Sequence, residues 1–200
     1  MKRIIALFIA VMLAFGVASC CMTQCNPEAP LATNFALHKN YTDHAVLQRG
    51  VPLRISGTAN VGQAVKVTLG KDTRYAVADA MGEWEAVLPA RKATKDGESL
   101  TLTVSGADGK SITCTDILVG EVWLCCGQSN MEMPMWTHAP NWRDNGGETV
   151  IAEAGKYANK IRLFNCAATK YVSPKVIQSE PRGQWLVATP EDIARFSAVG

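Results

Sequence analysis

Residues 117–133 read ILVGEVWLCCGQSNMEM, and this stretch decides how the rest of the chain is interpreted. Its first ten residues are almost continuously apolar, as in a strand that is buried on both faces within a parallel sheet. The run stops at Gly127, which permits a tight turn, and residues that favour helix follow it. The stretch therefore predicts a strand-to-helix turn in a sheet that helices cover.

The serine in this turn, Ser129, is placed to act as a nucleophile. A serine on a strand-to-helix turn has its hydroxyl lifted out of the sheet, and its backbone N–H lies near a helix N-terminus that favours negative charge. Acyl transfer needs this combination of an exposed Oγ and an N–H aimed at the developing oxyanion. Serine is also a common helix N-cap, so the turn alone leaves catalysis and capping open.

The preceding segment, residues 34–115, shows apolar and polar residues alternating with period two. Alternation of this kind marks strands with one buried face, and glycine-containing turns separate the strands. The clearest examples are residues 65–69, 84–88 and 100–104. Residues 34–115 therefore predict an antiparallel β-sandwich, Ig-like or jelly-roll. Within it, we expect Trp84 and Tyr75 to be core aromatics rather than a sugar-stacking platform.

Residues 120–134 resemble the nucleophile block of the sialate O-acetylesterase family, which belongs to the SGNH (GDSL-like) hydrolases. The likeness continues over most of residues 34–200, in the family's order. The further stretches that resemble the family are 43–49, 79–84, 161–164, 183–185 and 194–199. The resemblance implies a β domain followed by the start of an α/β, flavodoxin-like hydrolase domain, residues 116–200.

The resemblance also implies an activity, the removal of O-acetyl groups from sialic acid or a related sugar without a metal or other cofactor. Ser129 would attack the acetyl carbonyl, form an acetyl-enzyme and supply one oxyanion donor through its own N–H. Gly127, Gln128 and Asn130 match positions of the block, and we expect them to shape the turn and position polar groups. Cys126 stands where the family usually has a small residue, and we do not assign it as the nucleophile.

A serine nucleophile needs a base, usually a histidine oriented by a carboxylate. The chain holds only three histidines, His38, His44 and His138, and we expect them to be solvated or structural. In the family, the Asp-and-His block lies far downstream, and it has no match before Gly200. We therefore expect the 200 residues to be the N-terminal part of an esterase and to be inactive alone.

The C-terminal region supports the same expectation. Residues 189–192, Thr-Pro-Glu-Asp, have the capping hydroxyl, proline and acidic residues of a helix start. Buried strands are expected around Val122 and Leu163, with another near Lys175, fewer than the roughly five or six of a doubly wound sheet. The hydrolase domain is therefore expected to be truncated.

The N-terminus predicts export. Lys2 and Arg3 precede a short apolar run, so residues 1–19 are expected to be a cleaved signal peptide. Residues 17–20, Val-Ala-Ser-Cys, resemble a bacterial lipoprotein signal in which Cys20 is acylated, while plain secretion and a retained anchor are alternatives. Residues 20–33 would be a tether, and the expected location is the bacterial periplasm, the outer membrane or the cell surface.

Charge and cysteine content exclude other classes of protein. The formal charge of +2 comes from Lys2 and Arg3, and the remainder has 18 basic and 18 acidic residues. This balance gives no support for a nucleic-acid partner, and membrane contact is expected only through the lipid anchor. The seven cysteines lack zinc-site spacing. We expect Cys125 and Cys126 to be buried thiols, with a link to Cys114 or Cys166 left open.

The expected partner is an acetylated glycan, but its identity is open between sialic acid and other acetylated sugars. Arg143 lies in an aromatic and polar loop past the nucleophile and could meet the carboxylate of sialic acid, or the loop could serve packing alone. Two alternatives to a sialate esterase stand. They are an acetylxylan-type esterase and a non-catalytic sugar-binding or scaffold module built on the β-sandwich.

Overall fold

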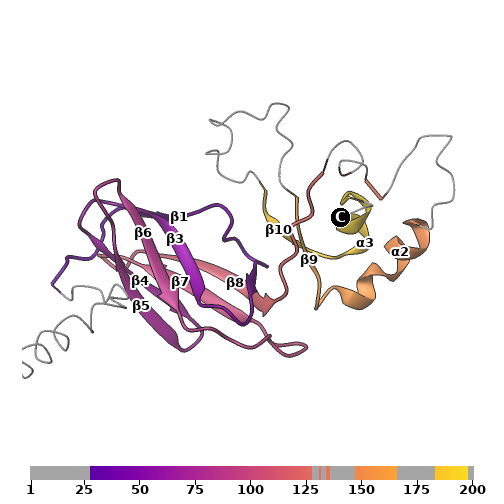
Figure 1. Cartoon of the computed structure of the whole chain (residues 1–200), viewed down its shortest axis with the longest axis horizontal. Coiled ribbons are helices and arrows are strands. Elements are labelled where there is room, and N and C mark those ends of the chain that lie inside the picture. Colours follow the sequence, from indigo (N-terminus) through magenta and orange to yellow (C-terminus); the bar gives the residue numbers. More distant parts are fainter. Residues whose placement is uncertain (1–27, 128–130, 132–133, 136–146, 166–182, 198–200) are drawn as a thin grey trace, which may run out of the picture.

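The computed structural model describes residues 28–127, 131, 134–135, 147–165 and 183–197 (Figure 1). Among the described residues, a run of eight strands comes first, and helices appear only after it. The strands of this run are β1 (Phe35–Leu37), β2 (Val46–Gln48), β3 (Leu53–Ala59), β4 (Ala64–Leu69), β5 (Asp72–Val77), β6 (Glu83–Leu88), β7 (Leu100–Ser105) and β8 (Ser111–Gly120). The later elements are α2 (Gly147–Glu153), the 3-10 helix η2 (Ala154–Tyr157), β9 (Arg162–Phe164), β10 (Trp185–Val187) and α3 (Pro190–Ala194).

The eight strands form two sheets that share one hydrophobic core. One sheet has the order β1-β3-β6 and the other has the order β2-β8-β7-β4-β5. All pairs are antiparallel except β2 with β8, which run parallel. The predicted β-rich first half is therefore confirmed, but the expectation of purely antiparallel sheets is wrong. The five-stranded sheet is mixed because β2 enters it beside the C-terminal half of β8.

The alternation of apolar and polar residues determines which face of each strand is buried. Trp84 is the largest fully buried side chain, with 2% of its surface exposed, and its Nε1 donates to the Thr58 carbonyl at 3.0 Å. Gly57 makes room for this ring, because a Cβ at that position would lie 2.6 Å from a carbon of the indole. The core role expected of Trp84 is confirmed, whereas Tyr75 is exposed.

The hydrophobic core includes residues before position 34. Ala32 is fully buried, and its N–H donates to the Ala64 carbonyl at 2.8 Å. The end of the expected tether thus belongs to the core. The signal region 1–19 and Cys20 lie outside the described residues. Among the residues that are described, no helix is long and apolar enough to cross a membrane.

Strand β8 is buried on both faces only in part. Ile117, Leu118 and Val119 are all buried, as the sequence predicts for this strand. Beyond Gly120 the strand ends and the chain becomes exposed, with 83% of Trp123 accessible. The expectation of a buried strand as far as residue 126 is therefore wrong. Its pairing partners explain the difference, because β2 reaches no further than Gly120 along β8 and no other described strand continues the sheet.

The described cysteines also change from buried to exposed at the end of β8. Cys114 lies on β8 and is a buried free thiol. Cys125 and Cys126 are exposed free thiols, so the expectation that they are buried is wrong. Cys166 lies outside the described part of the chain.

The second part of the structure contains a two-stranded antiparallel ladder between β9 and β10. In it Phe164 lies opposite Trp185, with ring centroids 5.2 Å apart. The strand predicted around Leu163 is therefore present, but the pairing described for it is antiparallel rather than parallel. The predicted helix start is confirmed, since Thr189 Oγ1 accepts the Asp192 N–H at 3.1 Å. The strand expected near Lys175 falls outside the described residues.

Replacing Trp84 with Ala is expected to lower the free energy of unfolding by about 3–5 kcal/mol, because it opens a cavity and leaves the Thr58 carbonyl without its donor. The matched control is Trp123→Ala, which removes an exposed ring and should cost less than about 0.5 kcal/mol. Urea unfolding followed by circular dichroism measures both. Equal costs for the two variants would contradict the described core.

Candidate functional site

Most of the predicted site residues lie outside the described part of the chain. Gln128, Ser129 and Asn130 are in this group, as is Arg143. Gly127 is described and exposed. A Cβ on Gly127 would lie 2.6 Å from Cγ of Met131, so the backbone approaches that side chain too closely for any other residue without a shift. This contact is a local reason for glycine at position 127.

The chain that leads to Gly127 is fixed by the end of β2. Arg49 Nε donates to Glu121 Oε1 at 2.7 Å, and Gln48 Nε2 donates to Oε2 at 3.0 Å. Gln48 also accepts the Val122 N–H on its Oε1 at 2.9 Å. The hydrogen bond from Gln48, followed by that from Arg49, lowers the pKa of Glu121. These bonds set the direction in which the chain leaves β8 toward Gly127.

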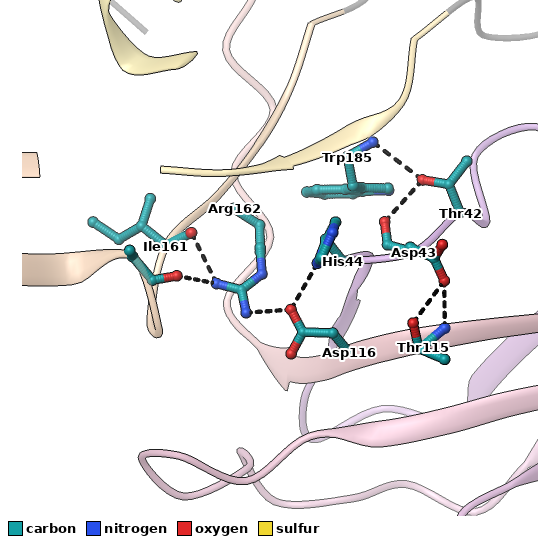
Figure 2. A network of polar contacts seen from close by, with 9 residues as sticks. Thr42, Asp43, His44, Thr115, Asp116, Ile161, Arg162 and Trp185 are labelled. Carbon is teal, nitrogen blue, oxygen red and sulfur yellow. Dashed lines mark hydrogen bonds and ion pairs between the residues drawn. The ribbon is translucent and has the colours of Figure 1, made fainter. Parts of the chain in front are cut away.

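A polar network joins the β part to the second part of the structure (Figure 2). At its centre, Asp116 Oδ2 accepts from His44 Nδ1 at 2.8 Å and from Arg162 Nη2 at 2.7 Å. The Arg162 side chain is only 3% exposed, and its Nη1 donates to the carbonyls of Ala158 and Ile161 at 2.7 and 3.1 Å. One carboxylate on β8 therefore links the loop before β2 to the start of β9.

The backbone at this network is strained. His44 and Asp116 have φ angles of 66° and 54°, a region that non-glycine residues seldom occupy. Such conformations persist where surrounding contacts hold them in place. The bond between the two side chains and the bond from the His44 N–H to the Thr115 carbonyl, at 3.0 Å, provide such contacts.

Two carboxylates of the network are held in their charged form. Partial burial raises the pKa of Asp116, but the hydrogen bonds from His44 and Arg162 and the charge on Arg162 outweigh burial and leave it below the ordinary value. The pKa of Asp43 is lowered by the backbone N–H of Thr115, at 2.6 Å, and then by the hydroxyl of the same residue. Asp43 and Asp116 are therefore both charged carboxylates, and each accepts two hydrogen bonds from neighbouring side chains or backbone.

Trp185 makes a second connection between the two parts. Its backbone N–H donates to Thr42 Oγ1 at 3.1 Å, and its Nε1 donates to the Asn40 carbonyl at 2.9 Å. In Figure 2 its ring lies above His44, on the same side of the network as Thr42. The family-like stretch 183–185 thus meets residues 40–42, which directly precede the family-like stretch 43–49. Sequence reasoning missed this junction, since no local pattern relates residues that are more than 140 positions apart.

The two described histidines serve as links within the fold. His44 is bonded to Asp116, as above. His38 lies between Ser56 Oγ, at 3.1 Å from its Nδ1, and Glu83 Oε2, at 3.2 Å from its Nε2. This serine–histidine–carboxylate order is that of a catalytic triad, but Ser56 lies inside β3, where the backbone groups pair in the sheet and supply no oxyanion hole. His138 is not among the described residues.

The described residues also hold no group of three or more histidine, cysteine, aspartate or glutamate side chains that could bind a metal ion.

Replacing Arg162 with Met should lower the free energy of unfolding by about 2–4 kcal/mol, because Asp116 and two carbonyls lose a buried donor. The control is Arg195→Met, which removes an exposed ion pair with Glu191 and should cost less than about 1 kcal/mol. Urea unfolding at neutral pH compares the two. A cost for Arg162→Met no larger than that of the control would show that the network does not hold the junction.

The network also predicts a pH dependence. Because the folded pKa of Asp116 lies below its ordinary value of 3.8, its stabilising contribution is complete above about pH 5 and is lost as the pH falls through the folded value. Asp116→Asn should therefore reduce the loss of unfolding free energy between about pH 5 and pH 2. Urea midpoints measured across this range test the point, and parallel curves for the two proteins would refute it.

The comparisons with known proteins bear on this arrangement. No family model matches the chain. Over 127 residues it is 29% identical to sialate O-acetylesterase of Mus musculus, a match that covers 60% of this chain and 23% of that protein.

Among solved structures, a carbohydrate acetylesterase from Xanthomonas citri aligns with a TM-score of 0.69 and 32% identity. That match covers 82% of this chain and 35% of the other. The chain thus spans only about a quarter to a third of the length of these two proteins. These matches support a sialate O-acetylesterase-like family for the chain.

Proposed function

We propose that this protein is part of a serine-dependent carbohydrate esterase that hydrolyses O-acetyl esters, with acetylated sialic acid as the substrate. The observation that carries the proposal is the structural match to a carbohydrate acetylesterase over 82% of the chain. Residues 120–134, with Ser129 in the turn that follows Gly127, supply the residue types that acyl transfer requires.

In the proposed reaction, Ser129 Oγ attacks the acetyl carbonyl carbon and the ester C–O bond breaks. The sugar oxygen leaves with a proton, and water then hydrolyses the acetyl-enzyme to acetate. The Ser129 N–H donates to the oxyanion, a contact worth about 3 kcal/mol of transition-state stabilisation in comparable enzymes. Gly127, Gln128 and Asn130 shape the turn and position polar groups around it.

The bonds from Gln48 and Arg49 to Glu121 support this assignment, because they fix the backbone that enters the turn. A nucleophile must be held within a fraction of an ångström of its attack geometry to be effective. Glu121, six residues before Gly127, is tied to the end of β2 by both of its carboxylate oxygens. We therefore assign Gln48 and Arg49 as positioning residues.

In this proposal, neither of the two described histidines is the general base. His38 and His44 are bonded to Glu83 and Asp116, and both belong to the β part of the structure. The 200 residues by themselves are therefore proposed to be inactive.

The architecture proposed with this function is a β-sandwich over residues 34–115 followed by the beginning of an SGNH hydrolase domain over residues 116–200. The shared core of the two sheets supports the β-sandwich. The hydrolase domain is supported by the order of the described elements, in which helices appear only after β8. Export through residues 1–19, with a lipid on Cys20, belongs to the same proposal. Arg143 is proposed to pair with the carboxylate of sialic acid.

Ser129→Ala is expected to lower kcat/KM for acetate release by at least about a thousandfold in the protein expressed from its full reading frame. Acetate is measured with O-acetylated sialic acid and, in parallel, with acetylated xylan. A higher rate with O-acetylated sialic acid supports the sialate assignment. A higher rate with acetylated xylan shows instead that the substrate is an acetylated neutral sugar.

Two control variants accompany this test. Ser111→Ala removes an exposed hydroxyl at the start of β8 and should leave the rate unchanged. Cys126→Ser should also remain active, because the adjacent thiol is not the nucleophile. Activity retained in Ser129→Ala, or abolished in Cys126→Ser, would overturn the assignment of Ser129.

A further inference from the structure

A groove of about 690 Å³ runs along the open edge of β1. Strand β1 is the outer strand of its sheet, and residues from both of its faces line the groove, among them Phe35 and Ala36. The volume lies within the range of small-molecule sites in proteins.

The groove lies at the junction of the two parts of the structure. Thr42 belongs to the wall on the β side, and Gly183 and Gln184, directly before β10, form the opposite wall. The bonds from Trp185 to Thr42 and Asn40 hold these walls together. The ladder of β9 and β10 therefore completes the groove where it docks on the β part.

The lining combines ring surfaces with polar groups. Phe35 and Tyr41 contribute half-buried aromatic rings. His38, Thr42 and Gln184 contribute an imidazole, a hydroxyl and an amide. A sugar ring matches this mixture, because its C–H faces are apolar and its hydroxyls project around the rim.

The polar groups of the groove are held by contacts behind them. The Tyr41 hydroxyl donates to the Arg54 carbonyl at 2.9 Å, and His38 is fixed by Ser56 and Glu83. The hydroxyl oxygens of Tyr41 and Thr42 keep lone pairs that can accept from a ligand. Gln184 is exposed and can both donate and accept. A site of this kind needs little rearrangement on binding.

The backbone of β1 adds further groups. The His38 N–H donates to the Ser56 carbonyl, and the Asn60 N–H donates to the Asn34 carbonyl. In an antiparallel pair, alternate residues face the partner strand, so Phe35 and Leu37 turn their N–H and C=O groups toward the open edge. With only three residues, β1 is too short for an added peptide strand to gain a useful ladder, and this favours a compact polyhydroxylated ligand.

We propose that this groove binds an oligosaccharide, as a subsite for sugar rings beyond the acetylated one. The choice of glycan rests on the proposed function, but binding itself requires neither Ser129 nor an acetyl group. The subsite would hold the glycan chain while the ester is cleaved elsewhere in the protein.

The test is isothermal titration calorimetry of the protein from its full reading frame with two sugars that lack acetyl groups, 3′-sialyllactose and xylohexaose. At least one should bind. Ala36 is exposed and lines the groove, so Ala36→Trp should fill it and weaken binding at least tenfold. Gln184→Ala removes one amide and should weaken binding about two- to tenfold. Thr101→Trp places the same ring at an exposed position of β7 and should leave binding unchanged.

The outcomes separate this proposal from the esterase assignment. Absence of binding for both sugars, or binding that neither Ala36→Trp nor Gln184→Ala weakens, overturns the subsite. Circular dichroism of each variant confirms that it is folded. Acetate release and its loss in Ser129→Ala are measured separately, so the esterase assignment can hold while the subsite fails. Sugar binding that persists in an inactive protein supports the subsite alone.

Discussion

The carboxylate of Asp116 is the group on which the arrangement of the two parts depends. Arg162 is almost completely buried, and burying a cation is costly unless an anion and hydrogen-bond acceptors surround it. Asp116 supplies that anion from β8, and its other partner, His44, comes from the loop before β2. The β9–β10 ladder is therefore placed by a charge requirement as well as by apolar contact.

The candidate site depends on the same placement. The loop that carries His44 continues into β2, and residues at the end of β2 hold Glu121, from which the chain continues to Gly127. The ladder that carries Arg162 also brings Gln184 to the groove beside β1. A change at the network would thus reach both the direction of the chain beyond β8 and the shape of the groove.

Much of the fold follows from local patterns in the sequence. Alternation predicted the strands and the burial of Trp84, and the Thr189 cap predicted α3. These features depend on neighbouring residues only, so they can be read without the tertiary structure. The parallel pairing of β2 with β8 and the exposure of residues 121–126 depend on where other strands end, and the apolar run contains no signal for that.

The candidate site divides in the same way. The resemblance to a hydrolase family identified Gly127, Gln128, Ser129 and Asn130 from a contiguous block. Nothing in that block indicates that Gln48 and Arg49 donate to Glu121. Hydrogen bonds across more than 70 residues leave no periodic pattern in the sequence. The assignment of His44 as a structural residue agrees with its bond to Asp116, but the bond itself could not be anticipated.

The pairing of β2 with β8 has a consequence for the order of folding. Arg49 and Glu121 are 72 residues apart, whereas β4 and β5 are joined by a tight turn. Contacts between distant residues close large loops and form slowly, so the local hairpins assemble first. During synthesis, β2 cannot pair until the chain has been made as far as Gly120. The segment that leads to Gly127 therefore receives its direction late in the folding of the β part.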